Sequence, residues 1–71
     1  MKIVKLNGQR FADKIGKGYY IVTGYALQDY QGFVSFDGIV PYHPTRKALQ
    51  SILDDGGFTV VPGYVQPMEV N

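Results

Sequence analysis

The side chains that could do chemistry are few in this chain, and their spacing does not suit catalysis. His43 is the only imidazole, and it lies between Tyr42 and Pro44 with no obvious partner to orient it as a general base. Asp54 and Asp55 are adjacent, so on a helix they point about 100° apart and do not converge on one metal ion or sugar. We expect a surface or capping role for His43 and a solvated helix end for the two aspartates.

Signatures of cofactor chemistry are missing as well. No serine lies in a nucleophile-elbow context, no zinc-ligand spacing is present, and there is no cysteine to provide a thiolate. The triplet Gly16-Lys17-Gly18 precedes a predicted strand, whereas a phosphate-binding loop opens a helix. The sequence therefore predicts a protein that is not an enzyme and that needs no metal or organic cofactor.

Composition indicates one small folded domain over residues 1–71. A chain of 71 residues buries only roughly 60% of its unfolded surface, and without cysteine no disulfide can add stability. Apolar residues at 45% and aromatic residues at 14% supply a core, while charged residues are sparse at 18%. The short apolar run at the N-terminus is interrupted by Lys5, and no stretch approaches the roughly 20 residues of a membrane span. We expect a cytoplasmic monomer with no membrane contact.

The first half of the chain reads as β-structure. Residues 2–6 predict a strand, and Asn7-Gly8 is a hairpin signal that would return residues 9–12 as a second strand. A short helix over residues 9–15 is the alternative, and the sequence leaves both open. Residues 19–27 predict a central strand, because both alternating sets of side chains are largely apolar; Gly24 indicates a bulge or a close crossing.

Turn signals organise the middle of the chain. Residues 28–32 predict a polar loop. Asp37-Gly38 predicts a hairpin between residues 33–36 and 39–42, or else one long bulged strand, with Pro41 at a sheet edge or strand end.

One helix is expected at about residues 45–55. Thr45 is a good N-cap, Gly56-Gly57 supplies the stop, and one apolar stripe is formed by Ala48, Leu49, Ile52 and Leu53. Residues 58–61 predict a last strand that ends at Pro62-Gly63, followed by a short return strand or a tail. The sum is an α+β fold, a small antiparallel β-sheet with one α-helix packed on one face. Leu49, Ile52 and Leu53 should be buried against Ile21, Val22 or their strand neighbours.

The predicted helix carries its charges against its own dipole. Arg46 and Lys47 lie in the first turn and Asp54 and Asp55 in the last, and each opposes the dipole by about 0.3–1 kcal/mol. With Gln50 they share one polar face that has no oppositely charged pair at helical spacing. Either tertiary neighbours such as Lys14 or Lys17 offset this cost, or the face was selected to meet a partner's charges.

A second binding hypothesis comes from aromatic and basic residues near the N-terminus. Exposed aromatic rings on a sheet beside cations can stack single-stranded bases. Lys14 and Lys17 lie shortly before a set of aromatic residues that could stack in this way, namely Tyr19, Tyr20, Tyr25, Phe33 and Phe36. The alternative places most of these rings in the core, since one sheet face must pack under the helix. The other face is apolar enough to need a partner or a second layer.

In length, lack of cysteine and strand–helix–strand layout, with RKALQSILDDGGFTVV as the helix-and-strand part, the chain resembles the small bacteriophage proteins that bind host RNA polymerase, of the Xanthomonas-phage type. The resemblance implies a host-takeover factor in the host cytoplasm. Such a factor occupies a polymerase surface, for example at the expense of a sigma factor, and redirects initiation and termination. It assigns no binding residue.

The sequence thus predicts a non-enzymatic, protein-binding regulator whose partner is a host RNA polymerase subunit. The residues expected to bind the partner are Arg46, Lys47, Gln50, Asp54, Asp55, Lys14, Lys17 and Tyr19. The alternative is a single-stranded nucleic-acid-binding domain that uses Tyr and Phe stacking and Lys contacts. A steep fall of oligonucleotide affinity with salt would favour the alternative.

Overall fold

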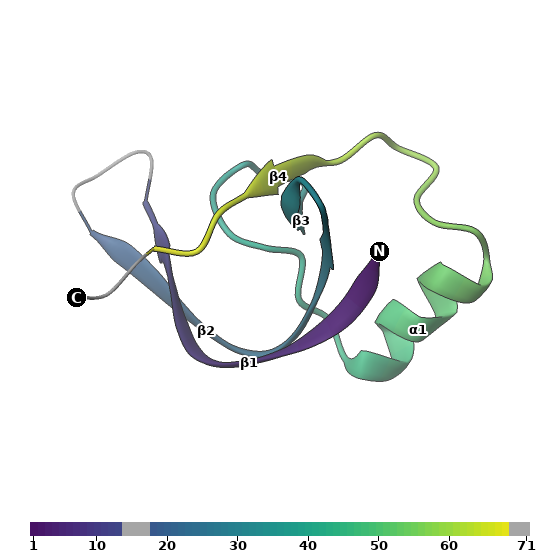
Figure 1. The fold of residues 1–71 in the computed structure, drawn as a ribbon, viewed down its shortest axis with the longest axis horizontal. Helices are drawn as coiled ribbons and strands as arrows, with labels where there is room; N and C mark the ends of the chain where they lie inside the picture. The colour runs from purple at the N-terminus through teal and green to yellow at the C-terminus, as the bar shows by residue number, and fades with distance from the viewer. Residues whose placement is uncertain (14–17, 69–71) are drawn as a thin grey trace.

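The protein folds as one antiparallel sheet with a short helix against it (Figure 1). The computed structural model describes residues 1–13 and 18–68. The elements follow the order β1 (Lys2–Ala12), β2 (Tyr19–Asp29), β3 (Gly32–Ser35), α1 (Arg46–Asp54) and β4 (Gly63–Val65). The strands lie in the order β1-β2-β3-β4, every neighbouring pair is antiparallel, and α1 contacts β2 and β1. The predicted α+β class, with one helix on one face of the sheet, is confirmed.

β1 is one long strand, and the predicted hairpin at Asn7-Gly8 is wrong. β1 pairs with β2 on both sides of these residues, with a register shift of one residue between Leu6 and Gln9. Gly8 has a φ of +68° and donates its N–H to the Thr23 hydroxyl at 3.1 Å. A left-handed glycine suits a bulge as well as a turn, so the dipeptide alone did not distinguish them.

The alternative helix over residues 9–15 is also wrong, because residues 9–12 belong to β1. Residues 14 and 15 of that prediction lie outside the described residues. The bulge expected near Gly24 lies beside that glycine, but the extra residue is in β1.

β2 is the central strand, as predicted, with β1 on one side and β3 on the other. The loop predicted over residues 28–32 is a tight turn at Tyr30 and Gln31. The Asp29 carboxylate accepts the Gln31 N–H at 2.8 Å, which closes the turn through a side chain.

The segment between β3 and α1 forms neither of the two predicted strand arrangements. The Asp37 carboxylate accepts the Val40 N–H at 3.1 Å, and the Ser35 hydroxyl donates to the Val40 carbonyl at 2.7 Å. These side-chain bonds close a local loop at Asp37-Gly38. The chain then returns to β3, where the Tyr42 N–H donates a hydrogen bond to the Val34 carbonyl at 2.7 Å.

The strand predicted over residues 58–61 is wrong, and the last strand is β4. Residues 58–61 pair with no strand, and the side chains of Val60 and Val61 are exposed. Pro62-Gly63, predicted as the turn that ends a strand, instead leads into β4. The predicted short return strand is confirmed for Tyr64 and Val65 within β4.

The chain after β4 brings the two edges of the sheet together. Pro67 forms a bridge with Phe11 of β1, and the Met68 N–H donates to the Arg10 carbonyl at 2.7 Å. β1 and β2 bend strongly along their length, as Figure 1 shows. The sheet is therefore a nearly closed barrel with an inner and an outer face.

A core cluster lies on each face. The inner cluster draws on all four strands and consists of Leu6, Phe11, Val22, Ala26, Phe33 and Val65. On the outer face, Leu27 and Val34 pack with Leu49 of α1, and Ile52 and Leu53 are partly buried beside them. The predicted burial is confirmed for Leu49, whereas Ile52 and Leu53 are only partly buried. The named partners are wrong, since Ile21 is 61% exposed and Val22 belongs to the inner cluster; the helix packs instead on Leu27, further along the same strand. No helix in the described part of the chain is long and apolar enough to cross a membrane.

Candidate functional site

α1 begins and ends where local sequence signals place it. The Thr45 hydroxyl accepts the Ala48 N–H at 3.3 Å as the N-cap. At the other end the Gly57 N–H donates to the Ile52 carbonyl at 2.9 Å, and Gly57 has a φ of +111°. The first turn holds no acidic residue and the last turn no basic one, so the charges do run against the helix dipole.

The polar face of α1 is open to solvent. Five predicted site residues lie on it and all are exposed: Arg46, Lys47, Gln50, Asp54 and Asp55. The Gln50 amide donates to the Asp54 carboxylate at 3.1 Å. Among the described residues no carboxylate pairs with Arg46 or Lys47, so the helix presents a basic end and an acidic end separated by about two turns.

The other three predicted site residues do not join this face. Tyr19 opens β2 at the end of the sheet far from α1 (Figure 1), and the Arg10 guanidinium lies 4.6 Å from the centre of its ring. Lys14 and Lys17 lie outside the described residues. The hypothesis that they offset the charges of Asp54 and Asp55 therefore stays a prediction. The structure thus groups the helix residues and separates them from Tyr19.

Two of the five rings expected to stack bases are used inside the protein. Phe33 is buried, and Tyr25 is partly buried against the outer cluster. Phe36 contacts Tyr42 and Phe58 edge to face, with ring centres 5.2 and 4.9 Å away, but it is 48% exposed in the loop after β3. Only Tyr19 and Tyr20, at 46% and 43% exposure, remain available on the strands.

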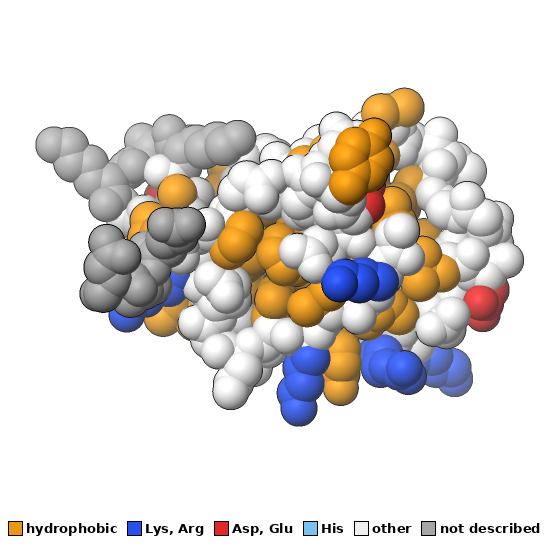
Figure 2. Space-filling view, in the orientation of Figure 1, with side chains coloured by type: hydrophobic (Ala, Val, Ile, Leu, Met, Phe, Trp, Pro, Cys, Tyr) orange, Lys and Arg blue, Asp and Glu red, His pale blue; other side chains and the backbone are white. Residues whose placement is uncertain are grey.

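The structure brings together basic residues that the sequence keeps far apart. Every described Lys and Arg lies in β1 or in the first turn of α1; these are Lys2, Lys5, Arg10, Arg46 and Lys47. Figure 2 shows their side chains along the lower side of the molecule, over β1 and the start of α1. Sequence reasoning missed this face, although the absence of Lys and Arg from residues 18 to 45 left only these elements to carry it.

Two of the aspartates have structural roles. The Tyr64 hydroxyl donates to Asp29 at 2.6 Å, and this bond lowers the pKa of Asp29 and raises the pKa of Tyr64. Backbone N–H groups of Ile39 and Val40 lower the pKa of Asp37 in the same way. Both carboxylates hold turns in place.

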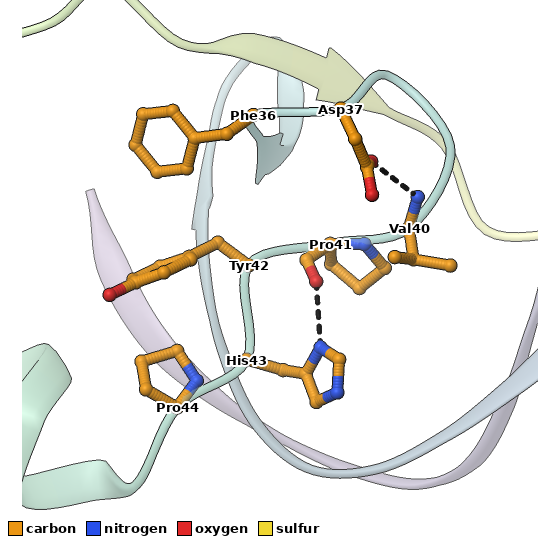
Figure 3. A pocket seen from close by; sticks show the side chains of 7 residues that line it. All are labelled: Phe36, Asp37, Val40, Pro41, Tyr42, His43 and Pro44. Carbon is orange, nitrogen blue, oxygen red and sulfur yellow. Dashed lines mark hydrogen bonds between the residues drawn. The ribbon is translucent and has the colours of Figure 1, made fainter.

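A shallow, mainly apolar pocket lies beside the loop that precedes α1 (Figure 3). His43 lines it, with its Nδ1 2.8 Å from the Pro41 carbonyl. Because a carbonyl oxygen only accepts, Nδ1 is the donor in this contact, and Nε2 is the ring nitrogen left for a ligand. The Asp37 carboxylate in the same pocket is bonded to Val40, and no described carboxylate orients the imidazole. The pocket can accept a hydrogen bond from a ligand, but it holds no paired acid and base.

Within residues 1–13 and 18–68, no three side chains of the metal-binding types cluster together. Comparison of the chain with protein-family models, with curated proteins and with solved structures finds no match, so its function is argued from the geometry above.

Proposed function

We propose that this protein is a non-enzymatic regulator that binds another protein through the polar face of α1. The observation that carries the proposal is the dipole-opposed charge pattern on a fully exposed helix face. Two cations and two aspartates each cost helix stability where they stand. These charges weaken their own helix and form few stabilising contacts within the protein. Complementary charges on a partner would explain why they are there.

The partner we propose is a bacterial RNA polymerase, with the protein acting in the host cytoplasm as a phage-encoded inhibitor of transcription. This identity rests on the resemblance in length, composition and layout to small phage polymerase-binding proteins. The face suits such a role because it presents opposite charges at its two ends. A partner that offers an acidic and a basic group at matching spacing would fix the orientation of the bound helix. Occupation of a polymerase surface needs no catalytic group on this chain.

The experiment is a binding titration of purified bacterial RNA polymerase, free of nucleic acid, with the wild type and a charge-swapped variant. The variant carries four changes in α1: Arg46→Glu, Lys47→Glu, Asp54→Lys and Asp55→Lys. Its net charge is unchanged. The control leaves α1 untouched and adds one charge of each sign at two exposed positions, through Thr59→Lys and Val61→Glu, so its net charge is also unchanged.

The proposal predicts that the swapped variant binds at least tenfold more weakly, while its melting temperature is unchanged or higher because each new charge favours the dipole. The control should bind like the wild type. Normal binding by the swapped variant would overturn the role of α1, and no binding by the wild type would overturn the choice of polymerase.

A further inference from the structure

The outer face of the β1–β2 pair is covered over only half its length. At one end Ile3 pairs with Leu27, and both pack in the cluster under α1. At the other end no described helix or strand covers Tyr19 or Ile21, which are 46% and 61% exposed, although Ile21 borders a pocket that residues of the 37–43 loop also line. We call the uncovered region the open patch; it consists of Lys5, Arg10, Tyr19 and Ile21.

The β-bulge puts both cations of the open patch on the same face. Lys5 and Arg10 are five residues apart, so regular alternation would send them to opposite faces. The one-residue shift between Leu6 and Gln9 restores them to one side. Lys5 then pairs with Tyr25 and Arg10 with Ile21, two residues on the same face of β2.

The cations of the patch are positioned rather than neutralised. The Arg10 guanidinium lies over the Tyr19 ring, 4.6 Å from its centre, which holds a planar cation beside an exposed aromatic surface. Within the described residues, no carboxylate pairs with Lys5 or Arg10. Lys2, Arg46 and Lys47 are exposed as well. Figure 2 shows Lys and Arg side chains as separate groups, most of them along the lower side of the molecule.

We infer that the open patch binds single-stranded nucleic acid, independently of the protein-binding role of α1. Lys5 and Arg10 supply charge for backbone phosphates, and Tyr19 with Ile21 offers an aromatic and apolar surface for an unpaired base. A duplex keeps its bases stacked and leaves the Tyr19 surface without a ligand. An acidic peptide would satisfy the cations alone, so the exposed ring favours a ligand that carries both phosphates and bases.

The test measures fluorescence anisotropy of a short labelled oligothymidylate at several salt concentrations. Lys5→Gln with Arg10→Gln removes two positive charges from the patch. Thr59→Glu with Val61→Glu lowers the net charge equally, away from β1, and is the matched control. Arg10 is half-buried, so its replacement could disturb the fold. The single variant Lys5→Gln changes only an exposed side chain and therefore tests the patch without that risk. Tyr19→Leu removes the ring but keeps an apolar side chain.

The inference predicts that the double Gln variant binds about tenfold more weakly, with a salt slope shallower by about 1.4 because two phosphates at roughly 0.7 each are lost. Lys5→Gln should lower affinity severalfold. Tyr19→Leu should bind at least fivefold more weakly with its slope unchanged. The matched control should stay within twofold of the wild type. The polymerase titration contains no nucleic acid, so failure here is distinct from failure of the polymerase proposal.

Four results would overturn the inference. These are no measurable binding by the wild type, an equal loss in the matched control, duplex DNA binding as tightly as the single strand, and full competition by polyglutamate. The last result would assign the patch to an acidic protein instead.

Discussion

Asp29 links the turn between β2 and β3 to β4 through its carboxylate. Its carboxylate closes the β2–β3 turn through the Gln31 N–H and accepts the hydroxyl of Tyr64 in β4 at 2.6 Å. The bond from Tyr64 is the largest cause of the lowered pKa of Asp29, and it also raises the pKa of Tyr64. The pair therefore stabilises the fold only while Asp29 is ionised and Tyr64 is protonated.

Tyr64→Phe should reduce the acid part of this pH dependence and remove the part that comes from Tyr64 itself. In the wild type the lowered pKa of Asp29 contributes stability above its ordinary value of 3.8, and this is lost as pH falls through the folded value. The raised pKa of Tyr64 contributes stability below 10.0, and this is lost as pH rises through its folded value. In the variant the carboxyl signal of Asp29, followed by NMR, should titrate closer to 3.8. An unchanged titration would show that the bond does not form in solution.

Among the elements, α1 could be predicted from the sequence almost to the residue. Its cap, its apolar stripe and its glycine stop are all local signals, and the structure places the helix at Arg46–Asp54. β1 and β4 could not be predicted in this way. Asn7-Gly8 fits both a turn and a bulge, and residues 58–61, which have strand-like composition, form no strand in the structure. Strand pairing depends on tertiary contacts that a local pattern does not contain.

The packing of α1 predicts which of its leucines matters most. Leu49 is fully buried against Leu27 and Val34, whereas Leu53 is only partly buried. Leu49→Ala should lower the free energy of unfolding by about 2–5 kcal/mol. Leu53→Ala should cost clearly less, because solvent already reaches its side chain. Urea denaturation followed by circular dichroism measures both, and an equal cost would contradict the packing described for α1.

The molecule as a whole depends on the close approach of β4 to the β2–β3 turn. Gly32 is buried and has a φ of +132°. A Cβ at this position would collide with the Gln66 side chain and lie 3.0 Å from the Val65 carbonyl oxygen. This contact joins residues far apart in the chain, and no sequence signal indicated it.

Gly32→Ala should therefore destabilise the protein by about 1–3 kcal/mol, through backbone strain and the displaced side chain. Gly18→Ala is the control, since its Cβ would meet nothing within 4 Å and its backbone is not left-handed. The control should stay within about 0.5 kcal/mol of the wild type. Thermal denaturation of the two variants compares them, and equal stability would contradict the observed approach of β4.

The candidate site was predictable only where it lies on one element. The five residues of the α1 face follow from helical spacing, and the structure groups them as expected. Lys5 and Arg10 lie on one face of the sheet because of a bulge in β1. Their position relative to Arg46 and Lys47 depends on how α1 packs against β1. Both are tertiary outcomes that periodicity along the sequence does not reveal.

The central claim is that α1 docks onto a protein partner through its polar face, and amide hydrogen exchange tests it most directly. The exchange of each peptide of this chain is compared with and without a saturating amount of purified bacterial RNA polymerase. The account predicts slower exchange in residues 45–57, with little change in β3 and β4. Slower exchange confined to other segments, or no change anywhere at saturation, would contradict it.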